Sequence, residues 1–315
     1  MRIISLLPGA TEIISLLGLE GSLVGVSHQC DYPASVRHLP NVTKTRLPPD
    51  IDSGQIDHQV RELACSGTSL FELDRQSIRS LLPDLIITQS LCSVCAVSES
   101  EVLELADQLP NHPKVLRLNP TGLADVLTCV QQIGTAADAV AQAAVAVATL
   151  QGRIDAVVAI TLGALDTAAV TRKRVLMLEW LDPLFCAGHW NPELVELAGG
   201  IETIGTAGAP SRRMEWDEVL DADPDVMIIA CCGLSIDRTL DDLPRLVSNR
   251  GFAQLRCIDQ GQVFLMDGDQ YFNRPGPRLI DSLELLAHTL HPTLHSLPSY
   301  LEPAVRMKRE PRLGR

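Results

Sequence analysis

The chain contains the same order of segments twice. A short apolar segment opens each copy, at residues 2–6 (RIISL) and 174–179 (RVLMLE), and a loop and an apolar helix follow it. The two helices end in LGLEGSLVGVS and LAGGIETIGTA, which put Gly25 and Gly205 in matching places. Each copy then reaches another apolar segment, LLPDLIITQ or DADPDVMIIA. A duplication of this kind predicts two similar α/β lobes, and two lobes in one chain create a cleft between them. Clefts of this kind are where ligands bind.

Length and charge narrow the classes of function. At 315 residues the chain exceeds the usual size of one hydrophobic core, so we expect two domains. The net charge of −13 argues against nucleic-acid binding, because the chain has few basic residues to neutralise phosphates.

The N-terminal segment and the cysteines indicate a cytoplasmic protein. A secretory signal needs an unbroken apolar stretch, whereas Pro8, Gly9, Thr11 and Glu12 interrupt this one. The chain has nine cysteines, an odd number, which favours reduced thiols. No apolar run approaches the ~20 residues of a membrane helix, so we expect no membrane-embedded segment.

Short apolar runs before turn signals predict the strands of parallel sheets, which are covered on both faces. These runs alternate with helical stretches and lie at residues 2–7, 23–27, 85–88, 115–118, 175–178, 226–230 and 263–266. The predicted fold class is therefore α/β, with two Rossmann-like lobes built on parallel central sheets.

An alanine-rich segment without proline, at residues 124–160, predicts one long helix. At 1.5 Å per residue the helix would be roughly 45–56 Å long, too long for one lobe, so we interpret it as a rigid connector. The predicted division is an N-terminal lobe at 1–120, the connecting helix at 121–165, a C-terminal lobe at 166–292 and a tail at 293–315. Several prolines predict that the tail is loosely held.

Ligands of open parallel sheets bind beyond the carboxyl ends of the strands. The residues after the predicted strands are therefore candidate site residues, and they include Pro8, Gly9, Ala10, Thr11, His28, Gln29, Cys30, Tyr32, Gln89, Cys92, Cys95, Glu179, Trp180, Phe185, Cys186, His189, Trp190, Cys231, Cys232, Asp269, Tyr271, Phe272 and Arg274. Gly9 precedes a helix whose first amides could receive an anion or an amide group.

Aromatic side chains gather in these strand-end loops. The chain has three Trp, three Tyr and five Phe, and five of them fall within residues 180–190 and 271–272. Aromatic side chains exposed in such loops would suit a flat apolar ligand. The alternative is that they pack the interface between the lobes.

Six of the nine cysteines lie at strand ends, near His28 and His189: Cys30, Cys92, Cys95, Cys186, Cys231 and Cys232. Thiolates and imidazoles bind soft or borderline metals, so a protein-bound metal is one hypothesis. Cys92 and Cys95 alone make half a zinc site, and cysteine also packs as a small apolar residue. Structural thiols and a redox or ligand-contacting role are the alternatives.

The sequence contains no complete catalytic motif. A Gly-rich phosphate loop, a G-x-S-x-G and an H-E-x-x-H are all absent from it. An enzyme would need Cys, His and Asp side chains brought together by folding. We therefore expect a protein that is not an enzyme.

Several segments together carry a resemblance to a known family. RIISLLPGATEIISLLGLEGSLVGVSHQCDYP, EWLDPLFCAGHWNPELVELAGG, LDADPDVMIIA and YFNRPGPRLIDSLELL resemble the substrate-binding proteins of vitamin B12 and iron-chelate ABC transporters. The resemblance runs from about residue 2 to residue 291, and QSLCSVCAVSESEV is similar to the cobalamin-binding branch. It implies two Rossmann-like lobes joined by a long helix, with a cleft that closes little on binding.

The resemblance also implies roles for single residues. In that family, aromatic side chains of both lobes enclose a corrinoid or a ferric chelate. The corresponding positions here are Tyr271 and Phe272 with the basic Arg274 beside them, Trp180, Phe185 and Trp190 in the second lobe, and Tyr32 with the turn of Pro8, Gly9, Ala10 and Thr11 in the first. Gln29, Gln89 and Asp269 would suit the amide-rich rim of a corrin.

Family members present one acidic residue of each lobe to an ABC permease. Glu99 or Glu101 corresponds to that residue in the first lobe, and Glu193 in the second.

The leading hypothesis is a binding protein for cobalamin or a related corrinoid or metal chelate, with an ABC permease as partner if the chain is exported. The expected cytoplasmic location favours an alternative, an intracellular protein that handles a metal or a tetrapyrrole with a cysteine-lined cleft. A metalloprotein and a thiol enzyme are the alternatives from other classes.

Overall fold

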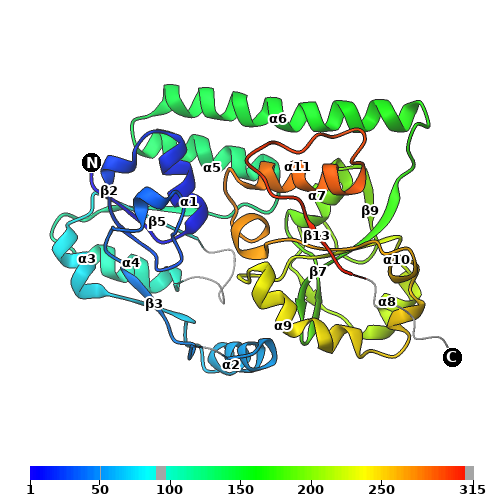
Figure 1. Ribbon diagram of the computed structural model, residues 1–315. Coiled ribbons are helices and arrows are strands. Elements are labelled where there is room, and N and C mark those ends of the chain that lie inside the picture. Colours follow the sequence, from blue (N-terminus) through cyan, green and yellow to red (C-terminus); the bar gives the residue numbers. More distant parts are fainter. Residues whose placement is uncertain (50, 90–96, 309–315) are drawn as a thin grey trace. The chain divides into compact units, whose positions relative to one another are not determined.

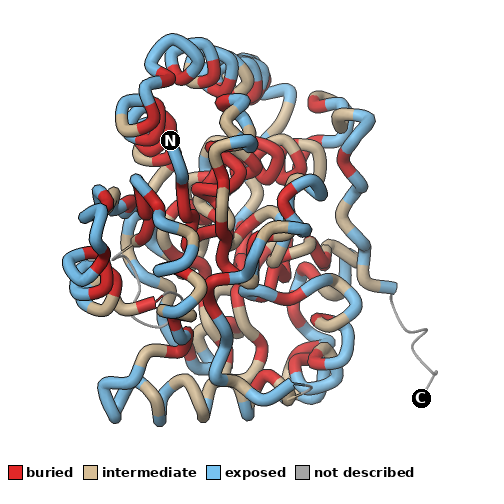
Figure 2. Tube along the Cα trace, turned by 90° about the vertical axis from the view of Figure 1, so that its left-hand side faces the viewer, coloured by how far each residue is buried: buried red, intermediate tan, exposed pale blue. Residues whose placement is uncertain are grey.

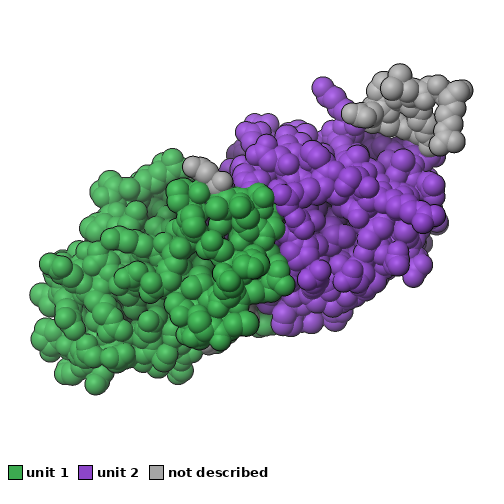
Figure 3. Space-filling view, turned by 90° about the horizontal axis from the view of Figure 1, so that it is seen from below, with its two compact units in different colours: residues 1–151, 275–277 green, residues 152–274, 278–315 purple. Residues whose placement is uncertain are grey.

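The computed structural model of the chain describes residues 1–49, 51–89 and 97–308. It divides into two compact units (Figure 3). Unit 1 consists of Met1–Gln151 and Pro275–Pro277, and unit 2 of Gly152–Arg274 and Arg278–Arg315. Both units are α/β structures built on parallel strands, which confirms the predicted fold class.

Unit 1 is built on a parallel sheet in the order β2–β1–β5–β6. Its strands are β1 (Ile3–Ser5), β2 (Leu23–Val26), β5 (Leu85–Gln89) and β6 (Lys114–Leu118), which confirm the apolar runs predicted there. A separate antiparallel pair consists of β3 (Thr43–Thr45) and β4 (Phe71–Leu73). The helices of this unit are α1 (Pro8–Leu16), α2 (Ser53–Cys65), α3 (Arg75–Leu81), α4 (Glu99–Gln108) and α5 (Leu123–Ala136) (Figure 1).

Unit 2 is built on a mixed sheet in the order β10–β8–β7–β11–β12–β13, and β9 also pairs with β7. The predicted strands are found as β7 (Lys173–Leu181), β11 (Val226–Ile229) and β12 (Val263–Leu265). The sequence analysis missed the short strands β8 (Leu184–Cys186), β9 (Gly200–Glu202), β10 (Arg212–Arg213) and β13 (Val305–Arg306). The helices are α7 (Asn191–Leu197), α8 (Trp216–Ala222), α9 (Ile236–Val247), α10 (Arg256–Asp259) and α11 (Leu279–Leu290).

The parallel strands of the two units share one topology, as the predicted duplication requires. The parallel strands of unit 1 lie in the order β2–β1–β5–β6, and those of unit 2 in the order β9–β7–β11–β12. Among these parallel strands, the one that comes second along the chain lies on one side of the first. The third and then the fourth lie on its other side. The expected match of two glycines is wrong, because Gly25 lies within β2 whereas Gly205 lies beyond the end of β9.

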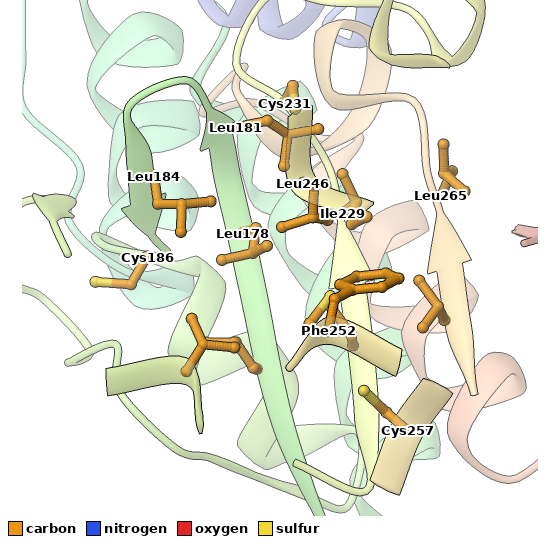
Figure 4. Packing of buried hydrophobic residues seen from close by; sticks show 14 of the residues in the cluster. Leu178, Leu181, Leu184, Cys186, Ile229, Cys231, Leu246, Phe252, Cys257 and Leu265 are labelled. Atoms are coloured by element: carbon orange, nitrogen blue, oxygen red, sulfur yellow. The ribbon is translucent and has the colours of Figure 1, made fainter. Parts of the chain in front are cut away.

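The central strands are buried on both faces (Figure 2). In unit 2, Leu178 of β7, Ile229 of β11 and Leu265 of β12 are all inaccessible to solvent. They belong to one apolar cluster with Leu246 and Phe252 (Figure 4). Each fully buried aliphatic side chain contributes roughly 1.5–3 kcal/mol to folding relative to an exposed one.

The predicted connecting helix at 121–165 is in fact two helices. α5 ends at Ala136, and α6 (Val140–Asp166) begins after a turn. Asp138 has a positive φ of 56° in that turn, and the Ala139 amide donates to the Gly134 carbonyl at 2.7 Å. The turn itself consists of Ala137, Asp138 and Ala139, without proline or glycine, so the alanine-rich composition concealed the break.

By length and composition alone, α6 could cross a membrane, and no other helix in the described part of the chain could. This finding corrects the expectation that no segment is long and apolar enough. A single helix of this kind is weak evidence for a membrane span. Within unit 2, Arg153 of α6 forms ion pairs with Asp281 (2.5 Å) and Glu284 (2.7 Å) of α11, so this part of α6 is tied to unit 2.

The tail at 293–315 is not loosely held over its described part. His295 and Leu301 are buried, and β13 pairs with β12. The His295 side chain lies 3.1 Å from the Thr161 hydroxyl of α6, and the His295 carbonyl lies 2.8 Å from Nδ1 of His288. Prolines therefore mark turns in this segment rather than a mobile extension.

Gly9 allows a very close approach between two distant segments of unit 1. A side-chain carbon added at Gly9 would lie 2.4 Å from the carbonyl oxygen of Pro275. A side-chain carbon added at Gly276 would likewise lie 2.9 Å from the Cα of Gly9. Only glycine fits at both positions, so the segment 275–277 covers the first turn of α1.

We expect Gly9→Ala to destabilise the protein by about 1–3 kcal/mol, because the added methyl overlaps the Pro275 carbonyl. A backbone group cannot move aside as the end of a flexible side chain can. Urea unfolding measures the loss. The control is Gly21→Ala, where the added carbon meets nothing within 4 Å. Equal stability of the two variants would contradict the close approach.

We expect unit 2 to lose stability as the pH falls below about 6.5, the ordinary pKa of histidine. Burial lowers the pKa of His295, and the neighbouring His291 and His288 lower it further. Burial also lowers the pKa of His291, which has Lys173 nearby. Both groups therefore bind protons more readily in the unfolded chain, and stability is fully present only above that pH.

Thermal melting between pH 5 and 8 tests this expectation. His295→Gln removes one titrating group, so its loss of melting temperature on acidification should be smaller than that of the wild type. His38→Gln, at an exposed position, serves as the control. An acid response that is identical in all three proteins would contradict the assignment to the buried histidines.

Candidate functional site

Glu179 is a buried carboxylate near the end of β7. It accepts hydrogen bonds from the Gly188 amide (3.0 Å), from Nδ2 of Asn191 (2.7 Å) and from the Ser211 hydroxyl. Burial raises the pKa of Glu179, and the three donors together with the nearby His189 oppose that rise. The carboxylate therefore joins β7 to the turn at 187–190, to the start of α7 and to the residue before β10.

His189 lies in that turn with a positive φ of 52°. Its amide donates to the Ala209 carbonyl at 2.6 Å, and its carbonyl accepts from the Gly208 amide at 2.8 Å. A residue with a side chain costs roughly 1–3 kcal/mol in such a conformation, and strain of this kind clusters at ligand-binding sites. The imidazole is half-buried, and its centroid lies 5.5 Å from the Trp190 ring.

Two of the aromatic residues expected to face a ligand are structural instead. Phe272 is fully buried, and Trp190 is only 6% exposed. The Trp190 indole donates to the Phe272 carbonyl at 2.7 Å, so the two residues connect the turn at 187–190 to the loop after β12. This finding corrects their predicted role, because a buried ring offers no face to a ligand.

Tyr271 lies in a single π-helical turn (Gly268–Phe272) and stays half-buried. The Arg278 guanidinium lies 5.8 Å from the centroid of its ring, and the Ser282 hydroxyl donates to its carbonyl at 2.8 Å. A guanidinium at this distance is attracted by the face of the ring. Sequence reasoning missed Arg278, although it belongs to the quoted segment YFNRPGPR, because a Pro-Gly-Pro turn separates it from Tyr271.

The polar residues of this loop are fixed by one another. Arg274 is buried and contacts both carboxylate oxygens of Asp269, each at 3.0 Å. A side-chain carbon added at Gly268 would lie 2.0 Å from the Cys231 carbonyl, and Asn273 donates to the carbonyls of both residues. The loops after β11 and β12 therefore form one rigid face of unit 2.

Trp180 and Phe185 face each other in the β7–β8 pairing and are half-buried. The Trp180 indole donates to the Asp182 carbonyl at 2.9 Å, and its ring packs on the apolar cluster of unit 2. Their predicted contact with a ligand stays a prediction.

In unit 1 the predicted turn at 8–11 is mostly covered. Ala10 and Thr11 are buried, and Gly9 lies against Pro275. The Thr11 hydroxyl lies 2.8 Å from Oγ of Ser5 and 3.1 Å from Sγ of Cys30. Gly9, Ala10 and Thr11 are thus packed within unit 1, and their predicted contact with a ligand stays a prediction.

Other predicted residues of unit 1 are more accessible. Gln29 and Tyr32 are exposed, while Pro8 and Gln89 are half-buried. Nδ1 of His28 lies 2.7 Å from the Thr43 hydroxyl, and its ring meets the edge of Phe71 at 4.9 Å. Burial lowers the pKa of His28.

The described cysteines do not form a metal centre. Cys30, Cys186 and Cys231 are buried and Cys232 is exposed, while Cys92 and Cys95 lie outside the described residues. Burial raises the pKa of Cys186, and raises that of Cys231 to about 12, so these thiols stay protonated. Within residues 1–49, 51–89 and 97–308, no three His, Cys, Asp or Glu side chains are placed to hold a metal ion.

The three glutamates proposed for partner docking lie in first turns of helices. Glu99 and Glu101 lie in α4, where Glu99 pairs with Arg117 at 2.7 Å, and Glu193 lies in α7. All three are half-buried.

Comparison with known proteins identifies relatives along nearly the whole chain. A family model described as periplasmic binding protein matches residues 3–270. The vitamin B12-binding protein of Photorhabdus laumondii is 22% identical over 306 residues, which cover 92% of this chain and 88% of the relative. That of Yersinia pestis is 25% identical over 314 residues, covering 95% and 88%.

Two solved structures share the fold. The periplasmic heme binding protein from Pseudomonas aeruginosa has a TM-score of 0.75 at 19% identity, covering 98% of this chain and 99% of that one. The periplasmic vitamin B12 binding protein of Vibrio cholerae has a TM-score of 0.66 at 22% identity, covering 92% and 96%.

We expect His189→Gly to be more stable than His189→Ala by about 1 kcal/mol, because glycine adopts a positive φ without strain. Both variants lose the imidazole, so the difference between their free energies of unfolding reports the backbone strain at residue 189. Urea unfolding measures this difference. In the middle of α6 the sign should reverse, with Ala156→Gly destabilising by about 1 kcal/mol. A more stable His189→Ala would contradict the left-handed conformation.

Proposed function

Because the chain belongs to the periplasmic binding protein family, we propose that it is a binding protein for cobalamin or a closely related corrinoid. The relatives of known name bind vitamin B12, and one structural neighbour binds heme. All of these ligands are flat rings around a metal ion. In this proposal the protein binds and releases its ligand without converting it chemically.

The pairing of Tyr271 with Arg278 is the observation that carries this proposal. A half-buried ring held by a buried guanidinium is a rigid aromatic surface at the carboxyl end of the unit 2 sheet. Such a surface stacks on a flat ring with little loss of side-chain entropy. His189 in its strained turn and the fixed Asp269–Arg274 pair supply polar groups for the rim of the ligand.

A tetrapyrrole with carboxylate substituents is the second candidate. The neighbour with the TM-score of 0.75 is described as a heme binding protein, and Arg274 already holds one carboxylate, that of Asp269, with a planar guanidinium of the kind that pairs with carboxylates. Corrin rims carry amides, so strong binding of hemin together with weak binding of hydroxocobalamin would favour this candidate.

The partner and the location belong to the same proposal. Family members of the transporter type deliver their ligand to an ABC permease, and we propose Glu193 of unit 2 and Glu99 or Glu101 of unit 1 as the docking residues. The cytoplasmic location expected from the cysteines stays a prediction, since the structural relatives carry the description periplasmic.

Visible absorption of the purified protein after mixing with hydroxocobalamin and desalting tests the proposal, with hemin in a parallel sample. We expect a retained and shifted corrin band. Tyr271→Ala should weaken binding about tenfold or more, because an aromatic anchor is lost. Tyr300→Ala, which removes the tyrosine beside Asp281, should bind as the wild type does. A colourless wild-type protein in both samples would refute the proposal.

A further inference from the structure

Unit 2 contains two carboxylates in different surroundings, the buried Glu179 and the half-buried Glu202, and burial raises the pKa of both. Glu202 accepts only backbone amides, those of Met177, Thr203, Ile204 and Gly205, at 3.1–3.2 Å. These donors come from β7 and from the residues directly after Glu202. Glu202 therefore closes a local turn after β9.

Glu179 joins segments that are distant in sequence. One carboxylate oxygen accepts from the Gly188 amide and from the Asn191 side chain, and the other accepts from the Ser211 hydroxyl. The Oδ1 atom of Asn191 is buried and has no hydrogen-bond partner in the described structure. The side-chain amide of Asn191 is therefore oriented by its hydrogen bond to Glu179, and this orientation leaves the buried Oδ1 without a hydrogen bond.

His189 lies between these anchor points. Gly188 precedes it, and Asn191 follows it by two residues. Gly208 and Ala209, in the loop that leads to Ser211, hold its carbonyl and its amide. Removing the carboxylate would release Gly188, Asn191 and Ser211 together. The turn would then relax toward negative φ at His189, because the strained conformation persists only where its surroundings impose it.

A purely structural role does not require a carboxylate at this position. A buried charge costs several kcal/mol of desolvation, and well-packed apolar residues of similar volume often stabilise a protein as well as buried charged groups do. A carboxylate suits this turn because its two oxygens can accept hydrogen bonds from Gly188, Asn191 and Ser211 at the same time.

We propose that Glu179 is a positioning residue for ligand binding, which holds His189 in its left-handed conformation and so orients the imidazole toward the ligand. This inference rests on the proposed function. It names a residue that makes no contact with the ligand itself and acts only through the turn at 187–190.

Three variants separate positioning from general stability. Glu179→Ala removes all three acceptor contacts. Glu179→Gln keeps one oxygen for Gly188 and Asn191, and its amide can donate to the Ser211 hydroxyl, so it should preserve the turn. Glu202→Ala removes a half-buried carboxylate whose hydrogen bonds go to Met177 and to residues 203–205, and not to residues 187–191.

Affinity for hydroxocobalamin and for hemin, measured by absorption titration, is the first readout. We expect Glu179→Ala to lose about tenfold or more, Glu179→Gln to stay within about threefold of the wild type, and Glu202→Ala to bind normally wherever it is folded. Equal losses of affinity in Glu179→Ala and Glu202→Ala would reduce Glu179 to a structural role and overturn the inference.

Hydrogen exchange of the His189 and Gly208 amides, followed by NMR, is the second readout and needs no ligand. Both amides should lose protection in Glu179→Ala and keep it in Glu202→Ala. Unchanged protection in Glu179→Ala would overturn the inference. If the wild-type protein binds neither probe, the proposed function fails, and exchange at His189 still decides whether Glu179 holds the turn.

Discussion

Burial of the central strands on both faces is the constraint on which the rest of the structure depends. Val175, Leu176, Met177 and Leu178 of β7 are all inaccessible to solvent, so no polar side chain can be placed along that stretch without a large desolvation cost. Polar groups are thereby confined to the strand ends, where Glu179 follows immediately in the chain. The position of a candidate site in each unit is thus a consequence of how its sheet is covered.

The same constraint explains which parts of the fold are predictable. Strands such as β5 and β11 stand out in the sequence because burial on both faces requires an unbroken apolar run. The short strands β8, β10 and β13 contain two or three residues each, and only pairing with a neighbouring strand makes them strands. The turn between α5 and α6 was missed for a related reason, because the sequence does not show the close approach that it creates: a side-chain carbon added at Gly134 would lie 2.4 Å from the Cβ of Ala143.

For the candidate site, sequence predicts which residues follow the strands, and packing decides which of them face solvent. Trp190 and Phe272 were expected to be accessible because they are aromatic and lie in loops. Both are buried, and the Trp190 indole donates a hydrogen bond to the Phe272 carbonyl. Glu179 was noted only as a strand-end residue, because its three donors come from parts of the chain that no pattern brings together. Arg278 escaped notice for the same reason.

The short segment Pro275–Pro277 has a consequence for the synthesis of the chain. It belongs to unit 1 although it follows β12 of unit 2, and Gly9 lies directly against it. During translation, the N-terminal unit therefore emerges first while the first turn of α1 is still uncovered. It acquires its contact with Pro275–Pro277 only after β7, β11 and β12 have left the ribosome. The unit that is made first is thus completed late, and maturation of the two halves is coupled by three residues.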